Sequence, residues 1–257
     1  MNRRNALVLE VAFPLAVLST IWWLSLGSET YYLPALPTIM ESFNDTWLSG
    51  HFAADLLPSL VRLAEGLLLA GVVGVTLGLL LGRVPRLARA VSPMVEFCRA
   101  LPAPVIIPAM ILVLGIGDMS KVVLIAFGCV WPVLLSTIDG VRGIDPLLIE
   151  TGRAYGITRR DTLRYIIVPA AAPQVFAGMR TALSIGIILM VISEMIASTN
   201  GVGYFVLESQ QTFAMPEMWA GIIMLGLLGF LLNAAFGLVE SRVLAWYHAT
   251  RMRSSAS

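Results

Sequence analysis

The stretch that decides the fold is Glu150–Pro169, which reads ETGRAYGITRRDTLRYIIVP and lies in the longest charged segment of a very apolar chain. The residues just before it, Asp145 and Pro146, predict the start of a helix. Aspartate is a preferred N-cap residue, and proline suits the first helical turn because the N–H that it lacks is not needed there. Gly156 predicts the end of this helix, since glycine readily adopts the left-handed conformation of a C-cap.

A second helix is predicted directly after the first. Thr158 is a suitable N-cap, and Asp161 follows three residues later in a weak variant of the capping box. Pro169 is expected to end this helix, because helices rarely continue through a proline. Two short helices in a charged segment, placed between hydrophobic segments, indicate an element that contacts a soluble partner.

The composition places the chain in a membrane. Of its 257 residues, 58% are hydrophobic and 13% are charged, and the mean hydropathy is +0.84. A helix that crosses a bilayer needs ~20 mostly apolar residues, and uncharged runs occur at 11–28, 66–82, 100–117, 122–138, 181–193 and 218–239. The fifth run extends to a span of 174–196 that carries Arg180 near one end. The runs are apolar on every face, unlike the alternating strands of a membrane barrel, so the sequence predicts an all-α polytopic membrane protein with six transmembrane helices.

Lysine and arginine set the expected orientation, because they are retained on the cytoplasmic side. With the N-terminus inside, 15 of the 17 basic residues fall in four cytoplasmic segments, 1–10, 83–99, 139–180 and 240–257. Only Arg62 and Lys121 fall outside. Both termini are therefore expected in the cytoplasm, and so is the loop between spans four and five that contains Glu150–Pro169.

The third predicted span holds three prolines within seven residues, at 102, 104 and 108. Such a segment cannot form a regular helix, and unpaired carbonyls at membrane depth require protein or a water-filled cavity beside them. It indicates either a broken span beside a transport pathway or a packed kink.

Glu194, at the outer end of the fifth span, is either functional, because acids are costly at membrane depth, or an interfacial structural hydrogen-bonding group. The candidate pathway residues are Pro102, Pro104, Pro108, Met190 and Glu194.

The second predicted span carries two spacings that indicate packing contacts. Gly74, Gly78 and Gly82 repeat every four residues, which lets two helices approach closely, either within one subunit or across a dimer. Arg62 and Glu65 are three residues apart at the outer start of this span. We expect these two to form a structural ion pair.

The sequence contains none of the patterns that support catalysis by this chain. It has no G-x-x-x-x-G-K-[ST] phosphate loop, no H-E-x-x-H or G-x-S-x-G motif, and no Cys/His spacing for a metal. With two histidines, no nucleophile–base pair can be proposed, and Cys98 and Cys129 are expected to be packing residues. The net charge of +1 gives no indication of nucleic-acid binding. We therefore expect no catalytic residue, metal site or cofactor in this chain.

At Glu150–Pro169 the chain resembles the membrane subunits, or permeases, of bacterial ABC importers. In that family a cytoplasmic loop carries E-A-A-x-x-x-G, then nine residues, then I-x-L-P. Four positions match at the family spacing: Glu150, Gly156, Ile166 and Pro169. Val168 replaces the leucine, and Thr151 and Gly152 replace the two alanines with other small residues.

The flanking sequence extends the resemblance over residues 55–210 and is similar to the branch that imports nitrate, sulfonates and taurine. The segments that carry it are SLVR at 59–62, EFCRALPAPVIIP at 96–108, GIG at 115–117, PAAAPQVFAGMR at 169–180, and Glu194 with GVGY at 201–204. The resemblance implies a type I permease in the bacterial inner membrane, with a single transmembrane domain over 1–257 and a second copy of itself as partner. It also implies two ATPase subunits that bind ATP and magnesium, an extracytoplasmic solute-binding protein, and a small organic or inorganic anion as the solute.

The resemblance makes the loop 139–173 the contact with the ATPase. Its implied coupling residues are Glu150, Thr151, Gly152, Arg153, Ala154, Tyr155, Gly156, Ile166 and Pro169. In the first helix, Gly152 leaves a bare spot for close backbone approach, while Arg153 and Tyr155 face a partner. In the second helix, we expect an apolar stripe that faces the protein, opposite three arginines. This stripe consists of Leu163, Ile166 and Ile167.

Two other functions fit the hydrophobicity of the chain. A secondary transporter or channel would work without ATPase subunits, but the spans hold few ionisable groups to carry a coupling ion. A non-transporting scaffold or insertion factor explains neither the two capped helices nor the proline-broken span. Uptake by proteoliposomes that contain this chain alone would favour the secondary transporter.

Overall fold

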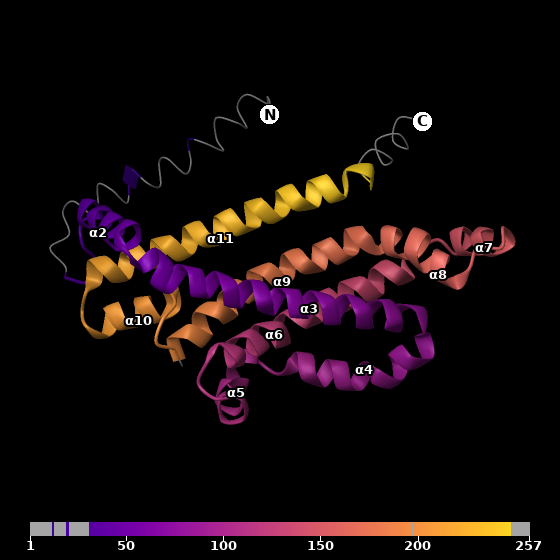
Figure 1. The fold of residues 1–257 in the computed structure, drawn as a ribbon, viewed down its shortest axis with the longest axis horizontal. Coiled ribbons are helices and arrows are strands. Elements are labelled where there is room, and N and C mark those ends of the chain that lie inside the picture. Colours follow the sequence, from indigo (N-terminus) through magenta and orange to yellow (C-terminus); the bar gives the residue numbers. More distant parts are fainter. Residues whose placement is uncertain (1–11, 13–18, 21–30, 197, 248–257) are drawn as a thin grey trace.

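The computed structural model describes residue 12 and residues 19–20, 31–196 and 198–247. Within these residues every regular element is a helix (Figure 1). The α-helices are α2 (Leu36–Ser49), α3 (Leu57–Arg83), α4 (Pro85–Ala100), α5 (Ile107–Leu114), α6 (Asp118–Arg142), α7 (Pro146–Ala154), α8 (Arg159–Asp161), α9 (Val168–Ile196), α10 (Val202–Gln211) and α11 (Met215–Val243). Two π-helical turns, Phe52–Leu56 and Thr162–Ile167, lead into α3 and α9, and a 3-10 turn at Ala103–Ile106 leads into α5.

The long helices extend along the length of the molecule (Figure 1). One end holds α2 and α10, and the other end holds α7 and α8. We call these the α10 end and the α7 end. The helices α3, α6 and α11 run from the α10 end towards the α7 end, and α9 runs in the opposite direction.

Four helical segments are long and apolar enough to cross a membrane: Phe52–Arg83, Asp118–Arg142, Arg159–Ile196 and Met215–Val243. They correspond to the second, fourth, fifth and sixth predicted spans. A fifth span is counted if the bent pair Pro85–Ala100 and Ala103–Leu114 crosses as one unit. The first predicted span, 11–28, lies outside the described residues apart from three positions.

The break predicted in the third span, 100–117, is confirmed. The helical axis turns by 84° between Pro85–Ala100 and Ala103–Leu114. Leu101 adopts an extended conformation, as expected for a residue directly before a proline, and the fixed φ and missing N–H of Pro102 prevent α4 from continuing. The α-helix that follows, α5, has 8 residues and is too short to cross a bilayer by itself.

The helices α3 and α6 pack in parallel along a row of glycines. An added Cβ on any of four α3 glycines would come within 2.5–2.9 Å of an α6 side chain: Gly66 against Ile125, Gly74 against Val133, Gly78 against Thr137 and Gly82 against Val141. Each partner lies the same number of positions further along the chain, so the two helices keep a constant register. Close approach of this kind adds van der Waals contact between helices in a membrane. The predicted glycine contact is therefore confirmed, and it is packing within one subunit.

The helix α9 completes the core against α6 and α3. Gly178 of α9 lies against the backbone oxygen of Pro132, and Gly186 lies against Leu63 and Cys129. Cys129 is fully buried, as its predicted packing role requires. The three helices therefore form one unit that connects the α10 end to the α7 end.

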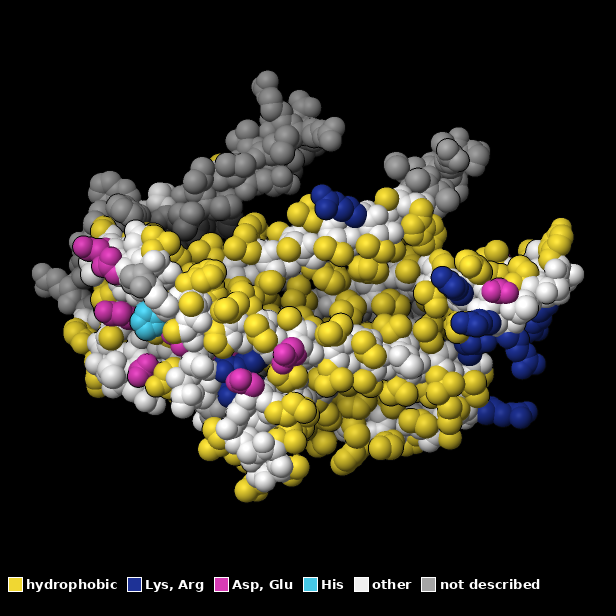
Figure 2. Space-filling model, viewed as in Figure 1, with side chains coloured by type: hydrophobic (Ala, Val, Ile, Leu, Met, Phe, Trp, Pro, Cys, Tyr) yellow, Lys and Arg dark blue, Asp and Glu magenta, His cyan; other side chains and the backbone are white. Residues whose placement is uncertain are grey.

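The surface of the long helices is largely apolar (Figure 2). On α11, Phe230, Leu231 and Leu238 are all well exposed, and on α5 so are Leu112 and Val113. Arginine side chains gather instead at the α7 end (Figure 2). An apolar belt of this extent suits lipid or a partner subunit rather than water.

Pro169 does not end the second predicted helix, so that expectation is wrong. The short helix α8, the π-helical turn Thr162–Ile167 and α9 form one continuous helical segment, Arg159–Ile196. A proline in a helix clashes with the carbonyl four residues before it, here that of Tyr165. Tyr165 lies in the π-helical turn, and the wider winding of that turn gives the proline ring room.

Candidate functional sites at the two ends of the molecule

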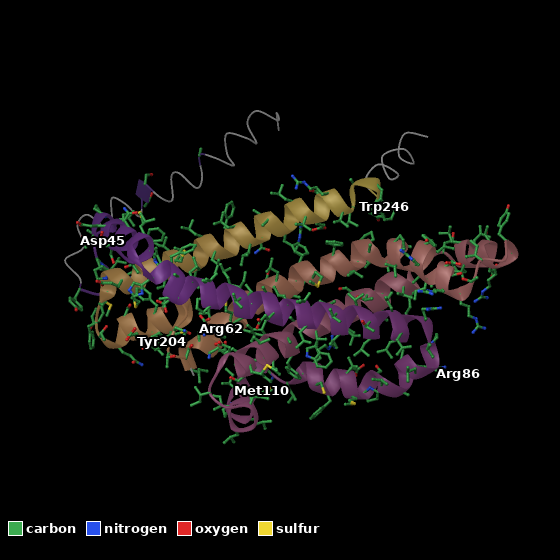
Figure 3. The ribbon with its side chains drawn as sticks, viewed as in Figure 1. Asp45, Arg62, Arg86, Met110, Tyr204 and Trp246 are labelled. Atoms are coloured by element: carbon green, nitrogen blue, oxygen red, sulfur yellow. The ribbon has the colours of Figure 1, made fainter. Side chains whose placement is uncertain are left out.

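A network of polar groups lies at the α10 end, where five segments meet, and most of its members are buried. The segments are the turn before α3, the start of α3, the start of α6, the end of α9, and the loop that leads into α10. The side chains of the network are Asp55, Ser59, Arg62, Asp118, Glu194 and Asn200, joined by backbone N–H groups of residues 201–203. We call this set the polar network. Figure 3 shows Arg62 towards the end that holds Tyr204, with Arg86 at the opposite end.

Glu194 is the centre of the polar network and is fully buried. Arg62 Nη1 donates to its Oε1 at 2.8 Å, and the backbone N–H of Gly203 donates to its Oε2 at 3.1 Å. Ser59 Oγ lies 2.8 and 2.9 Å from its two carboxylate oxygens. A buried carboxylate is tolerable only when it is paired and hydrogen-bonded, and both conditions hold here. The geometry therefore favours the structural interpretation of Glu194.

Arg62 joins three segments through one guanidinium group. Its Nε and Nη2 lie 2.7 and 2.6 Å from Asp118 Oδ1 at the start of α6. Its Nη1 donates to the Asn200 carbonyl oxygen at 3.2 Å, and its Nη2 donates to the Asn200 side chain. The predicted pair with Glu65 is wrong, because Arg62 is on the buried face of α3 and Glu65 is exposed. The other acids lie far away in sequence, and only the packing of α6 and α9 brings them close.

The loop into α10 is held by the same groups. Asp55 Oδ1 accepts from the Gly201 N–H at 2.8 Å, and Ser59 Oγ accepts from the Val202 N–H at 3.0 Å. Gly201 has φ +115°, and an added Cβ there would lie 2.6 Å from Glu194 Oε1. The free N–H groups at a helix start attract acidic partners, so these side chains cap α10 and close the loop. The sequence analysis did not identify Asp55. The available signal was Glu194 followed by the glycines at 201 and 203, which marks the loop that Asp55 holds.

At the α7 end, the predicted helix caps are confirmed. Asp145 Oδ1 accepts from the Leu147 N–H at 2.9 Å, so Asp145 is the N-cap of α7. Gly156 has φ +72°, the left-handed conformation expected just after the helix. Thr158 Oγ1 accepts from the Asp161 N–H at 3.2 Å and donates to the Asp161 carboxylate at 2.6 Å.

The helix α7 attaches to the molecule by one side and leaves its other side free (Figure 1). Leu147 and Tyr155 are 65% and 83% exposed, and Glu150, Thr151, Arg153, Ala154 and Gly156 are exposed too. Gly152 is buried, and an added Cβ would lie 3.0 Å from Ile166 Cδ1. The bare spot predicted at Gly152 is therefore occupied by a residue of the same chain. Exposed apolar and charged side chains on a rigidly capped helix suit a protein partner.

The apolar stripe predicted after α7 is confirmed. Ile167 is 4% exposed and Leu163 and Ile166 are half-buried. The arginines on the other side of this segment, at 159, 160 and 164, are exposed. This stripe holds α7 against the π-helical turn that leads into α9.

The predicted pathway residues occupy two different environments. Met190 and Glu194 are fully buried in the core of the described chain. Pro102 and Pro108 are exposed and Pro104 is half-buried, all near the bend between α4 and α5. Their part in a pathway stays a prediction. Within the described residues no group of three or more His, Cys, Asp or Glu side chains is placed to hold a metal.

Comparisons with known proteins agree with this geometry. Residues 74–245 match the family described as "Binding-protein-dependent transport system inner membrane component". The chain is 32% identical to the putative aliphatic sulfonates transport permease protein SsuC of Bacillus subtilis, over 90% of this chain and 85% of that protein. It is 31% identical to the taurine transport system permease protein TauC of Escherichia coli, over 91% and 88%, and 27% identical to the nitrate import permease protein NrtB of Leptolyngbya laminosa, over 93% and 88%.

A solved structure shares the fold. It is the inward-facing MetNI methionine ABC transporter, matched with a TM-score of 0.65 at 21% identity, over 76% of this chain and 97% of that chain.

Proposed function

Because the chain belongs to the family of binding-protein-dependent transport system inner membrane components, we propose how it works as the membrane subunit of an ABC importer. It is a multi-pass inner-membrane protein, and its relatives are transport permeases. In the proposed assembly, two copies of the chain form the pathway, and a solute-binding protein delivers the solute from outside. Two separate ATPase subunits bind ATP and magnesium, and this chain carries no cofactor.

The proposed topology has six spans, with both termini and α7 in the cytoplasm. The support is the distribution of charge between the two ends. Exposed arginines gather around the α7 end: Arg83, Arg86, Arg142, Arg153, Arg159, Arg160 and Arg242. Among the described residues, the basic side chains near the α10 end are those of Arg62 and Lys121, and both are buried. Basic residues at the ends of spans are retained on the cytoplasmic side.

The proposed coupling element is the segment 139–173 with α7 as its contact with the ATPase. The observation that carries this proposal is that α7 is capped at both ends, fixed by Gly152 against Ile166, and exposed elsewhere. A rigid element passes on a movement of its partner instead of absorbing it. ATP binding would then favour one of two discrete arrangements of the spans, which is the condition for any ligand to drive a conformational change.

The test is to reconstitute the chain with its ATPase subunits and binding protein in proteoliposomes, and to compare Glu150→Ala and Gly156→Pro with the wild type. Proline cannot adopt the positive φ of Gly156, so that variant disrupts the end of α7. Both variants should hydrolyse ATP with reduced or absent uptake. Glu65→Ala is the matched control, an exposed glutamate on α3, and should behave as the wild type. Wild-type uptake by both loop variants would remove the coupling role.

The proposed solute is a small organic or inorganic anion. The support is that relatives are named for aliphatic sulfonates, taurine and nitrate. Thermal-shift measurements on the cognate binding protein with sulfonates and nitrate would identify the solute. Uptake by proteoliposomes that hold this chain without ATPase subunits would instead support a secondary transporter or channel.

A further inference from the structure

The break in the third span brings Arg99 to the middle of the membrane-spanning part. Helix α4 starts at the α7 end, where Figure 3 labels Arg86, and Arg99 follows Arg86 by 13 residues near the other end of this helix. At ~1.5 Å per residue, Arg99 lies ~20 Å further along α4, within an apolar layer that is ~30 Å thick. This distance is well beyond the reach of one side chain back to the α7 end.

The residues around Arg99 agree with this depth. Arg99 lines a cavity together with Phe127 and Trp131, which lie about halfway along the 25-residue helix α6. Phe127 follows the first residue of α6 by 9 positions, a distance of ~14 Å at the same rise. From α9, the cavity is lined by the isoleucines at 185, 188 and 192. Arg99 is thus distant from both ends of the long helices.

The side chain of Arg99 starts from the inner face of α4. On this face Ala88 is buried, and both Ala88 and Val95 pack against residues of α3 and α6. Arg99 follows Val95 by four residues, one turn further along the same face. The helical axis then turns by 84° after Ala100, so no further turn of α4 covers Arg99, which is exposed.

Arg99 has no counter-charge among the described residues. No carboxylate oxygen of the described chain lies within 4 Å of its guanidinium nitrogens. Glu96, about one turn earlier on α4, is exposed and accepts from Ser92 Oγ at 3.1 Å. An arginine at membrane depth is costly, faces the interior of a bundle or a water-filled cavity, and is paired there. The partner of Arg99 is therefore expected from outside the described chain.

The cavity beside Arg99 has a volume of about 290 Å³ and largely apolar walls. Phe127 and Trp131 pack edge to face on the α6 side, with 5.5 Å between their ring centroids. Ile188 is 58% exposed on the α9 side, so the cavity is open to a solute from the surface of the described chain. One cation and apolar walls thus meet in one place.

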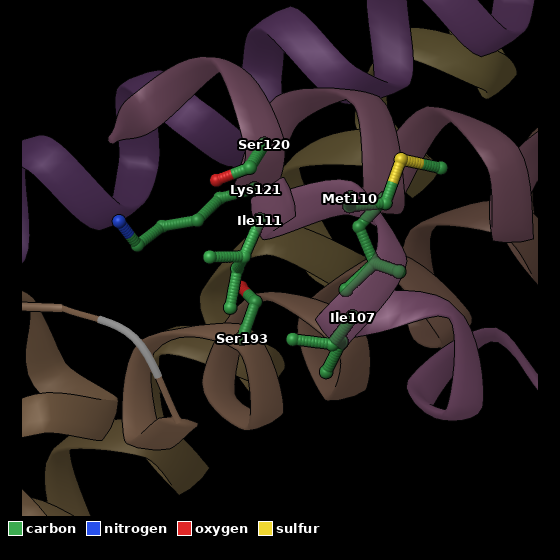
Figure 4. Close-up of a pocket in the computed structure, with 7 residues that line it drawn as sticks. Ile107, Met110, Ile111, Ser120, Lys121 and Ser193 are labelled. Atoms are coloured by element: carbon green, nitrogen blue, oxygen red, sulfur yellow. The ribbon is translucent and has the colours of Figure 1, made fainter. Parts of the chain in front are cut away.

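The floor of the cavity lies where α6, α9 and the bend meet. An added Cβ on Gly128 would touch Leu189 of α9 and would lie 3.5 Å from the Ala103 Cβ at the bend. The neighbouring cavity, between α5, α6 and α9, measures only about 10 Å³ (Figure 4), which is room for about one water molecule. Of these two cavities, only the one beside Arg99 can hold a solute.

We propose that Arg99 binds the charged group of the transported anion, a sulfonate or nitrate, in this cavity. The inference rests on the proposed function, in which the solute is a small anion, and it makes Arg99 a specificity-determining residue of the pathway. A guanidinium presents its N–H donors in a planar fork that matches the paired oxygens of an oxyanion. The aromatic and isoleucine side chains contact the alkyl part of a sulfonate. Binding by one cation also lets the anion leave again, as passage through a pathway requires.

The first experiment measures binding without transport, in the complex of the permease with its ATPase subunits in lipid nanodiscs. Ile188→Cys places a thiol in the cavity, and Cys98→Ala removes the partly exposed native thiol. The rate of reaction with the neutral reagent N-ethylmaleimide is compared in four solutions: sodium methanesulfonate, sodium nitrate, sodium chloride of equal ionic strength, and the neutral analogue dimethyl sulfone. Methanesulfonate or nitrate should slow the reaction more than chloride or dimethyl sulfone. Addition of Arg99→Gln should abolish this protection, and addition of Arg86→Gln, which removes an exposed cation at the α7 end, should not.

Equal reaction rates in all four solutions, or protection that survives Arg99→Gln, would overturn the site. If Arg99 pairs instead with a carboxylate of a second copy, Arg99→Gln should lower the unfolding midpoint of the complex, and the oxyanions should give no protection even with Arg99 present. That result also rejects the proposal. If Arg99→Gln does not assemble, the comparison of the oxyanions with dimethyl sulfone in the parent decides.

The second experiment measures uptake of methanesulfonate and nitrate by the assembled transporter in proteoliposomes. Arg99→Gln should lower the initial rate at least about tenfold, as expected for a lost charge-assisted hydrogen bond, while the loaded binding protein still stimulates ATP hydrolysis. Arg99→Lys keeps the charge but loses the planar fork, so it should retain part of the rate, and Arg86→Gln should behave as the wild type.

Uptake separates this inference from the proposed function. Wild-type uptake kinetics in a complex with Arg99→Gln would reject Arg99 while the importer function stands. Absence of ATP-driven uptake in the wild type would reject the function, and the thiol protection would still decide the site.

Discussion

The two ends of the molecule treat their polar groups in opposite ways. At the α10 end, Asp55, Arg62 and Glu194 are buried and bonded to groups on segments far apart in the chain. At the α7 end, the polar bonds are local caps, and the side chains of α7 point outwards. A polar side chain whose hydrogen bonds and ion pairs are formed within its own chain contributes to stability, whereas an exposed polar side chain is available to a partner. Removal of a polar side chain should therefore lower the stability of the fold at the α10 end and weaken coupling to a partner at the α7 end.

The largest loss of stability is expected from Arg62→Met. It leaves Glu194 buried without a cation, and removing one partner of a buried ion pair costs ~3–5 kcal/mol. The measurement is the unfolding midpoint of the purified chain in detergent. Arg180→Met is the matched control, because the Arg180–Glu240 pair is also close, at 2.6 Å against 2.8 Å for Arg62–Glu194, but the Arg180 side chain is 56% exposed. Loss of such a pair costs ~0–1 kcal/mol.

The double variant Arg62→Met with Glu194→Gln sharpens this test, since it removes both buried charges. It should regain part of the lost stability, because a neutral amide is less costly to bury than a carboxylate. Equal destabilisation by Arg62→Met and Arg180→Met would show that burial does not separate the two ends as argued.

A smaller loss is expected where α3 and α6 connect the ends. Gly78→Val places a side chain where even a Cβ would lie 2.5 Å from Thr137, and overpacking of this kind costs ~1–3 kcal/mol. Gly226→Val is the control, because no atom lies within 4 Å of a Cβ at that position on α11. Similar unfolding midpoints for the two variants would mean that the parallel α3–α6 contact carries little stability.

The local features of the α7 end could be predicted because their partners are neighbours in sequence. Asp145, Gly156 and Thr158 each act on a group within four residues, and the structure confirms all three. The glycines of α3 were also predictable as a close contact from their spacing. Pro169 was not, because a π-helical turn before it removed the clash that ends an ordinary helix.

The polar network could be predicted only in fragments. Arg62 and Glu194 are separated by 132 positions, and local reasoning instead chose Glu65, three residues away. Which acid an arginine meets depends on how α3, α6 and α9 pack, and no spacing rule contains that information. The costly acid at the end of an apolar span did mark Glu194 as a residue that must have partners.

A modest and local effect is expected from Asp145→Ala. Loss of an N-cap costs ~0.5–2 kcal/mol, and here the helix that loses it is only 9 residues long. The cost should appear as faster amide hydrogen exchange within α7, with little change in exchange at α3 and α6. Exchange that rises equally in α7 and in the core would show that α7 is part of the cooperative unit, which would contradict the separation of the two ends.

The smallest effect on folding is expected from Tyr155→Ala, and this variant tests the comparison most directly. Tyr155 is 83% exposed, so its truncation should change the free energy of unfolding by no more than ~0.5 kcal/mol. If its ring is there for a partner, association with the ATPase subunits should weaken, because exposed aromatic residues often carry much of the binding energy of an interface. Co-purification of the ATPase with this variant, at several salt concentrations, measures that loss. A destabilised chain would show that Tyr155 contributes to folding, as the buried groups of the α10 end do. A stable chain with unchanged ATPase binding would contradict the role of Tyr155 in contacting the ATPase.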